Sequence, residues 1–183
     1  MLSDLQEKKL TRYFQVYDID DDGRIEVSDL ERVMENVRIL RGAAEGSFAE
    51  QGLRHAFMTF WSSLNGSADV DRDGAVDLDE WLAYWQIALE NDARYEEEVE
   101  AITDHLFTIF DTDEDGEIGP DEFVDFYGVF GLGSNLARSM FVELDANSDG
   151  VISRGELLEI SRQFYRSDDP SSPGNMLFGP YGV

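Results

Sequence analysis

The stretch "DIDDDGRIEVSD", residues 18–29, carries six acidic side chains around a single glycine. Acidic residues occupy positions 1, 3, 5, 9 and 12 of this segment, with Gly23 at position 6 and the aliphatic Ile25 at position 8. Three short carboxylates at alternate positions turn toward one point, a backbone carbonyl follows at position 7, and glycine permits the tight turn. A solvated run of charge has no reason to keep this order. The spacing therefore predicts a calcium-binding loop between two helices.

Three further copies of the segment follow along the chain. They read "DVDRDGAVDLDE", "DTDEDGEIGPDE" and "DANSDGVISRGE", each with glycine at position 6, an aliphatic residue at position 8 and an acid at position 12. Four ordered matches exclude coincidence, even in so acidic a chain. We name them loops one to four, residues 18–29, 69–80, 111–122 and 145–156. The predicted ligands, with the backbone carbonyl at position 7, are Asp18, Asp20, Asp22, Arg24 and Asp29 in loop one; Asp69, Asp71, Asp73, Ala75 and Glu80 in loop two; Asp111, Asp113, Asp115, Glu117 and Glu122 in loop three; and Asp145, Asn147, Asp149, Val151 and Glu156 in loop four.

Apolar residues at helical spacing flank each loop, so the sequence predicts an all-α fold of four helix–loop–helix units, or hands. The position 8 residues are all β-branched, which favours a short β bridge between neighbouring loops. We therefore expect hand one to pair with hand two and hand three with hand four, in two lobes packed compactly. The expected divisions are residues 1–92 and 93–166 for the two lobes and 167–183 for a tail. Within them, we expect a helix to end early at Gly66 and a bend at Asn91–Asp92.

Composition narrows the function further. The net charge of −26 repels nucleic acid and anionic membranes, which leaves divalent cations as the natural counterions. Cysteine is absent, so neither a disulfide scaffold nor a thiolate metal site is expected. Because no apolar run has the length of a membrane span or the pattern of a leader, we expect a cytoplasmic protein, and a monomer.

No catalytic motif competes with the loops. The two histidines, His55 and His105, fall in predicted helices without a cysteine or second histidine at metal-ligand spacing. Nothing resembles a nucleophile elbow or a glycine-rich phosphate loop. We therefore expect a binding protein that is not an enzyme and whose partners are calcium and magnesium ions.

The four loops, the long first linker, "FWSSLNGSADVDRDG" at residues 60–74 and "DDPSSPGNMLFGPYG" at residues 168–182 resemble one known family, the sarcoplasmic calcium-binding proteins with their bacterial relative calerythrin. The resemblance implies a compact protein of four EF-hands that buffers calcium and magnesium. Such proteins often carry a degenerate loop, whereas all four loops are well formed here, so up to four calcium sites are expected.

Two alternatives to a buffer remain. A sensor would open on calcium and expose a methionine-rich groove to target proteins, although five methionines scattered over the chain make a poor groove. The second alternative is a luciferin-binding protein or photoprotein, a class that resembles this chain in its compact four-hand fold. Such a protein would hold a chromophore in an aromatic-lined cavity. Photoproteins place a histidine near the end of the chain, and this tail has none.

The loops are not expected to be equal. Loop three is expected to be a strong site. Loop two has an irregular entry, so it is the loop expected to fail if any does. Asp29 is one methylene shorter than the glutamate usual at position 12, which favours six-fold coordination and predicts magnesium in loop one at resting calcium. In the tail, prolines end the last helix, yet the apolar run "NMLF" at residues 175–178 follows. We expect this run to fold back onto the helical core.

Overall fold

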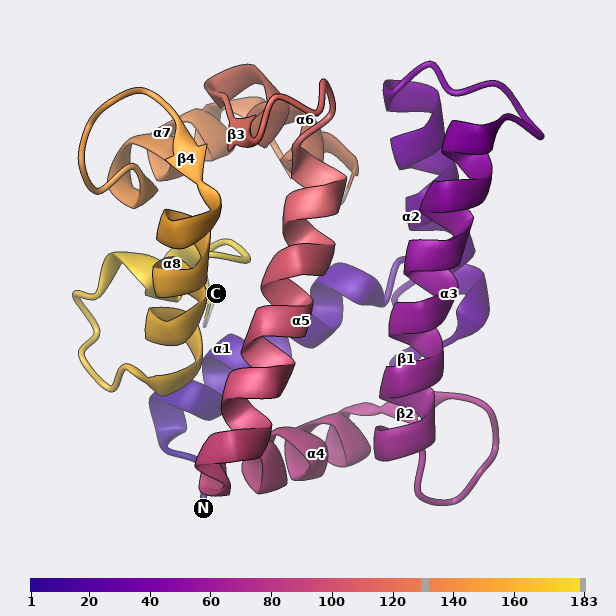
Figure 1. The fold of residues 1–183 in the computed structure, drawn as a ribbon. Coiled ribbons are helices and arrows are strands. Elements are labelled where there is room, and N and C mark those ends of the chain that lie inside the picture. The colour runs from indigo at the N-terminus through magenta and orange to yellow at the C-terminus, as the bar shows by residue number, and fades with distance from the viewer. Residues whose placement is uncertain (130–131, 182–183) are drawn as a thin grey trace.

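The computed structural model describes residues 1–129 and 132–181, and in them the chain forms a ring of helices around a shared core (Figure 1). Each loop joins two helices and contains a two-residue strand. The helices are α1 (Asp4–Tyr17), α2 (Val27–Leu40), α3 (Phe48–Ala68), α4 (Leu78–Glu90), α5 (Asp92–Phe110), α6 (Pro120–Val129), α7 (Ser134–Leu144) and α8 (Arg154–Arg166); the strands are β1 (Arg24–Ile25), β2 (Val76–Asp77), β3 (Glu117–Ile118) and β4 (Ile152–Ser153); and a 3₁₀ helix, η1, spans Pro173–Met176. The expected all-α class is confirmed. Within the described residues, no helix is long and apolar enough to cross a membrane.

The short strands pair as the sequence predicts. β1 runs antiparallel to β2, with Ile25 opposite Val76, and β3 runs antiparallel to β4, with Ile118 opposite Ile152. All four side chains are buried, because the bridge lies between the helices of each pair. A β-branched residue suits this position, since its rigid side chain packs on the pleated surface. Each bridge fixes two loops back to back.

Of the two expectations for the helix ends, one is confirmed and the other is wrong. The bend is confirmed, because α4 ends at Glu90 and the Asn91 side chain accepts a hydrogen bond from the Arg94 N–H at the start of α5. The expected stop at Gly66 is wrong, since α3 continues to Ala68 and the Asp69 N–H still bonds to the Asn65 carbonyl. Gly66 lacks the positive φ of a glycine that ends a helix. A glycine inside a helix weakens it without breaking it.

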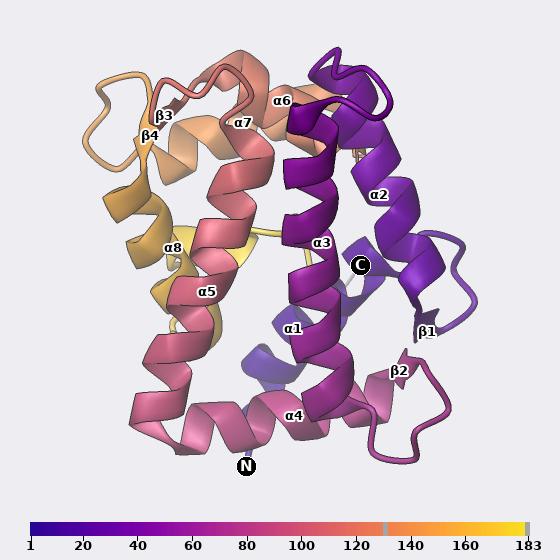
Figure 2. The ribbon, with the colours of Figure 1, turned by 45° about the vertical axis from the view of Figure 1, so that its right-hand side comes forward.

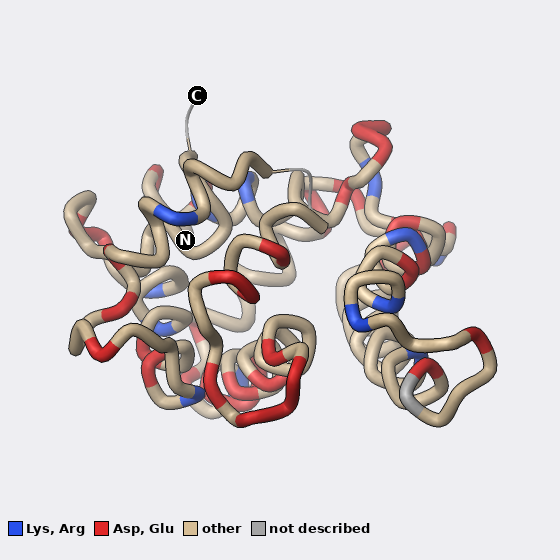
Figure 3. The backbone as a smooth tube through the Cα atoms, turned by 90° about the horizontal axis from the view of Figure 1, so that it is seen from above, with Lys and Arg blue, Asp and Glu red and all other residues tan. Residues whose placement is uncertain are grey.

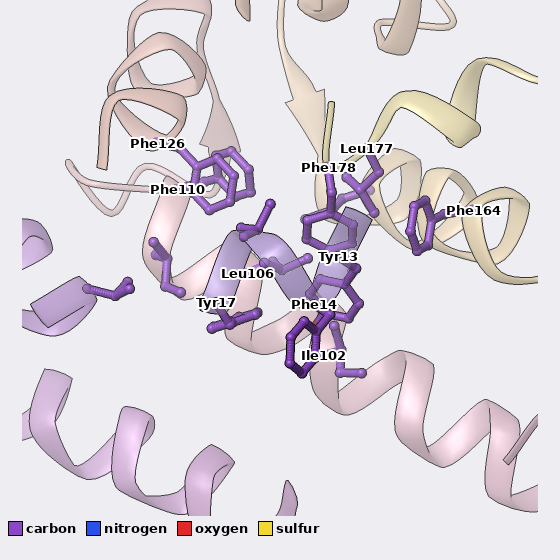
Figure 4. Close-up of a cluster of buried hydrophobic side chains, with 14 of the residues drawn as sticks. Tyr13, Phe14, Tyr17, Ile102, Leu106, Phe110, Phe126, Phe164, Leu177 and Phe178 are labelled. Atoms are coloured by element: carbon purple, nitrogen blue, oxygen red, sulfur yellow. The ribbon is translucent and has the colours of Figure 1, made fainter. Parts of the chain in front are cut away.

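One aromatic core joins hands that lie far apart in the sequence. The Tyr13 ring of α1 packs against Trp81 of α4, with ring centroids 4.9 Å apart, and against Phe164 of α8, at 6.1 Å. The Trp85 ring of α4 stacks on Tyr165 of α8 at 4.3 Å. Figure 4 shows part of this cluster, to which helices of both halves contribute. The four hands therefore form a compact body, and turning the view shows the helices enclosing one interior (Figure 2).

The segment after α8 returns to the helical core. It runs beside α8, forms η1 and brings Leu177 and Phe178 to 1% exposure. The expected tail, residues 167–183, includes residues 182–183, which lie outside the described part of the chain. Residues 130–131 of the expected second lobe also lie outside it.

Candidate metal centres

The four loops share one backbone conformation, although their sequences differ. The residue at position 4 is left-handed in each, with φ of 57 to 63°, and the position 6 glycine has φ of 86 to 94°. The glycine N–H then donates to Oδ2 of the position 1 aspartate, at 2.9 to 3.1 Å in the four loops. The N–H of position 7 donates to Oδ1 of position 5, at 2.9 to 3.1 Å. These bonds turn the acidic side chains toward the inside of each loop.

Three of the predicted ligands in each of loops one to three lie close together. Asp18, Asp20 and Asp22 bring carboxylate oxygens within 4.8 Å of one another, as do Asp69, Asp71 and Asp73 in loop two, and Asp111, Asp113 and Glu122 in loop three. Carboxylates at such distances repel one another strongly unless a cation lies between them. Figure 3 shows stretches of acidic residues along the backbone, with fewer basic residues between them. Oxygen ligands of this kind fit calcium or magnesium.

The position 12 acid ties the two ends of a loop together. In loop three, Glu122 Oε1 accepts from the Thr112 N–H at 2.7 Å and Oε2 accepts from the Gly119 N–H at 2.8 Å. Glu80 makes the same bonds in loop two, to the N–H groups of Val70 and Asp77. The position 12 side chain thus lies over the opening of the loop, where a bidentate ligand belongs.

Asp29 makes the corresponding bonds in loop one with a shorter side chain. Its Oδ1 accepts from the Ile19 N–H at 3.2 Å and its Oδ2 from the Glu26 N–H at 2.9 Å. Asp29 is 2% exposed, and this burial raises its pKa, against the two hydrogen bonds, which lower it. Loop one is therefore closed by the same two kinds of bond as the loops that end in glutamate, although its bond to the position 2 N–H is longer, at 3.2 Å against 2.8 Å in loop two and 2.7 Å in loop three.

Loop four differs in charge and in hydrogen bonding. The Asn147 Nδ2 donates to Asp149 Oδ2 at 2.9 Å, so an amide replaces one of the repelling carboxylates. Asp145 Oδ1 and Glu156 Oε1 are buried and have no hydrogen-bond partner. Leaving such oxygens unpaired is costly, and a cation between positions 1 and 12 would satisfy both. This pair of oxygens is the clearest evidence that the donor set of loop four fits a divalent cation.

The carbonyls predicted at position 7 belong to residues in or beside the strands. Arg24 and Glu117 begin β1 and β3, while Ala75 and Val151 come directly before β2 and β4. The bridges therefore fix these carbonyls relative to the neighbouring loop.

Sequence reasoning missed the polar contacts that surround the ligands. The Arg24 guanidinium pairs with Asp73 across the two loops and lowers the pKa of that carboxyl. Arg32 contacts Asp20, with 3.2 Å between Nη1 and Oδ2. The Ser153 hydroxyl donates to Glu156 Oε2 at 2.8 Å. The hydroxyl at position 9 was visible in the sequence, but the cross-loop pair depends on which loops meet.

The comparisons with known proteins agree with this geometry. EF-hand domain pair models match residues 7–86 and 100–129, and an EF hand model matches residues 137–161. Calerythrin from Saccharopolyspora erythraea is 25% identical over 167 residues, covering 90% of this chain and 94% of the relative. The sarcoplasmic calcium-binding protein beta chain from Penaeus sp. is 26% identical, covering 97% of this chain and 95% of the relative. The chain therefore belongs to the EF-hand family, and over nearly its whole length it is similar to the sarcoplasmic calcium-binding proteins and calerythrin.

Solved structures share the arrangement. A Streptomyces coelicolor calcium-binding protein, described in connection with prokaryotic calcium-mediated regulation, has a TM-score of 0.72 at 25% identity and covers 87% of this chain and 98% of its own. The coelenterazine-binding protein from Renilla muelleri, in its calcium-loaded apo form, has a TM-score of 0.78 at 20% identity and covers 97% of this chain and 99% of its own. The second likeness is one of fold alone.

Proposed function

We propose that this calcium-binding EF-hand protein is a cytoplasmic buffer of calcium and magnesium ions, rather than a sensor or an enzyme. The observation that carries the proposal is the tail, because Leu177 and Phe178 are 1% exposed against the helices and cover apolar surface that a sensor would offer to targets. A protein that binds ions without exposing new surface takes up calcium and transmits nothing further. No protein partner is required, and a monomer suffices.

The four loops would hold the ions through their own carboxylates. In each loop, the side chains at positions 1, 3 and 5 supply three oxygens, the position 7 carbonyl a fourth, and the position 12 acid closes the site. Bound calcium supplies a charge that neutralises the repulsion within the loop. We assign the mixed calcium and magnesium site to loop one, because Asp29 is short.

Calorimetric titration of metal-free protein with calcium tests the proposal, with and without magnesium at about 2 mM, a concentration at which only magnesium-competent sites fill. At least three of the four loops should bind calcium, and magnesium should weaken binding at loop one. A stoichiometry of one or zero would refute the assignment of the four loops as calcium sites. A hydrophobic dye separates the two roles, since a buffer should give little calcium-dependent fluorescence and a sensor a large rise.

A second candidate function rests on a cavity of about 380 Å³ between α3, α4 and α5. Aromatic side chains line it, and two buried polar atoms at its wall, Trp85 Nε1 and His105 Nε2, have no hydrogen-bond partner. A flat, uncharged aromatic molecule would fill such a space and satisfy these atoms. Quenching of tryptophan fluorescence by added coelenterazine tests this role, because Trp81 and Trp85 both line the cavity. Saturable quenching would favour a luciferin-binding function, and its absence would leave the buffer alone.

A further inference from the structure

The residues of the tail occupy a groove whose walls come from three different hands. Phe178 stacks on Tyr13 of α1, with ring centroids 3.9 Å apart and planes at 17°, and meets Phe164 of α8 edge-on at 4.9 Å. The Tyr127 hydroxyl of α6 donates to the Leu177 carbonyl at 2.7 Å. Figure 4 shows Leu177 and Phe178 directly against Tyr13 and Phe164. This arrangement is a small apolar pocket that holds two adjacent side chains of one peptide.

The polar side chains of α1 recognise the backbone around the same segment. Neighbouring residues three apart in a helix lie close together. The Ser3 hydroxyl, at the N-cap of α1, donates to the Asp168 carboxylate, Gln6 Nε2 donates to the Tyr165 carbonyl at 3.0 Å, and Arg12 Nε donates to the Phe178 carbonyl at 3.1 Å. Of these three bonds, only that of Arg12 reaches residues 174–178, and those of Ser3 and Gln6 hold the start of α1 against α8 and the segment that follows it.

Lys9, also in α1, is fully buried. Its Nζ donates to the Ser167 carbonyl at 2.8 Å, to Asn175 Oδ1 at 2.9 Å and to the Gln163 carbonyl at 3.4 Å. Burial lowers the pKa of Lys9 to about 8, because the ammonium has lost water. Two of its three acceptors lie after α8, so the groove demands an amide or carboxylate oxygen where Asn175 lies. An apolar side chain at that place would remove one of the three acceptors of this buried ammonium, and the Ser167 and Gln163 carbonyls would remain.

Gly174 marks the point of closest approach between the tail and α8. A Cβ at this position would lie 2.5 Å from Gln163 Cβ and 2.6 Å from the Ile160 carbonyl oxygen. The contact with a backbone oxygen cannot be relieved by turning a side chain. The groove therefore accepts only glycine before the asparagine.

We propose that this groove is a docking surface for a short peptide of the form Gly-Asn-apolar-Leu-Phe. Residues 174–178 of the same chain are its resident ligand, and they close the groove to partner proteins. The occupant is defined by four requirements: no side chain at the first position, an oxygen for Lys9 at the second, and a large aliphatic and an aromatic residue at the last two. None of these contacts involves a loop ligand. A partner protein with such a segment would have to displace the tail.

A labelled synthetic peptide of residues 171–181 tests the proposal on the full-length protein, by fluorescence anisotropy. The parent should bind it weakly, because the tail competes from within the chain. Gly174→Ala should open the groove and tighten peptide binding by about tenfold or more, since apparent affinity follows the fraction of open molecules. Gly66→Ala is the matched control, because no atom lies within 4 Å of the added Cβ, and it should bind as the parent does.

Peptide chemistry gives the second arm. The same peptide with Phe178→Ala or Asn175→Leu should lose binding to the Gly174→Ala protein. The proposal is overturned if Gly174→Ala, folded by circular dichroism, binds the peptide no better than the parent, or if the altered peptides bind as well as the original. Should Gly174→Ala fail to fold, full-length Phe178→Ala replaces it, because this change removes the aromatic anchor without creating a clash. Unchanged peptide binding by that protein would equally overturn the proposal.

Discussion

Asp29 closes loop one by accepting a hydrogen bond from a backbone N–H on each of its carboxylate oxygens. In loops two and three a glutamate, with its longer side chain, accepts from the corresponding backbone groups. Asp29→Glu adds a methylene, which lets the side chain offer two oxygens to an ion at greater distance. We expect the ratio of calcium to magnesium affinity at loop one to rise, because calcium accepts seven ligands and magnesium six. Competition titration followed by site-resolved NMR measures this ratio.

Loop three supplies the reciprocal control. Glu122→Asp shortens a side chain that makes the same two kinds of bond, so selectivity there should move toward magnesium. If both substitutions leave selectivity unchanged, the length of the position 12 side chain does not decide which ion is bound.

His105 makes the stability of the fold depend on pH. It stacks on Phe60 with centroids 4.5 Å apart, and burial lowers its pKa from 6.5 to about 4. Between these pH values the unfolded chain takes up a proton that the folded chain excludes, so the free energy of unfolding falls as pH falls. The loss attributable to His105 approaches about 3 kcal/mol at pH 4.

His105→Phe isolates this contribution, since phenylalanine retains a ring against Phe60 and cannot be protonated. Urea unfolding of calcium-free parent and variant between pH 7 and pH 4 should give curves that diverge in the variant's favour as pH falls. Parallel curves would contradict the assignment, because carboxylate protonation affects both proteins alike.

At the scale of elements, Arg41 links the first pair of hands to the third hand. It follows α2, and its guanidinium donates to the carbonyls of Thr108 and Asp111 at the end of α5, the latter at 2.8 Å. A cation at a helix C-terminus satisfies free carbonyls and meets the negative end of the helix dipole. Arg41→Ala should lower the free energy of unfolding by about 1 kcal/mol. Chemical denaturation measures the change.

Arg138 provides the comparison for that measurement. Its ion pair with Asp121 is exposed, at 59% and 88% for the two side chains, so Arg138→Ala should change stability little. Equal effects of the two substitutions would show that Arg41 acts as a surface charge and not as a cap.

The sequence predicted those elements that are determined by residues close to one another in the chain. The loops are encoded by ligand spacing within twelve residues, and the bridges by β-branched residues at a fixed position in each loop. Gly66 was misread because the residue alone does not tell a helix interior from a helix end. The contacts of Arg41 and Lys9 could not be predicted, since they depend on which distant helices meet. The apolar run of the tail signalled burial, but nothing local identified α1 as its partner.

For the whole molecule, charge opposes folding when ions are scarce. A net charge of −26 on 183 residues repels itself, and the loops concentrate much of that repulsion. Raising potassium chloride from about 10 mM to about 200 mM should increase the melting temperature of metal-free protein, because salt screens these charges. Thermal melts followed by circular dichroism measure the increase.

The same melts with saturating calcium supply the control. Bound ions neutralise the loops directly, so the calcium-loaded protein should melt higher and respond less to salt. A salt response of equal size in both states would place the repulsion outside the loops.

The bonds between α1 and the segment after α8 join residues 154 to 166 positions apart. Within a loop, by contrast, the glycine and the aspartate that it fixes are 5 positions apart. Closing the longer separation requires most of the intervening chain to be ordered first, because the entropy of loop closure must be overcome before these contacts form. The local contacts of each hand are therefore expected to form before the contacts between α1 and the segment after α8. We therefore expect the contacts between α1 and the segment after α8 to gain protection from hydrogen exchange later in refolding than the ion-binding loops do.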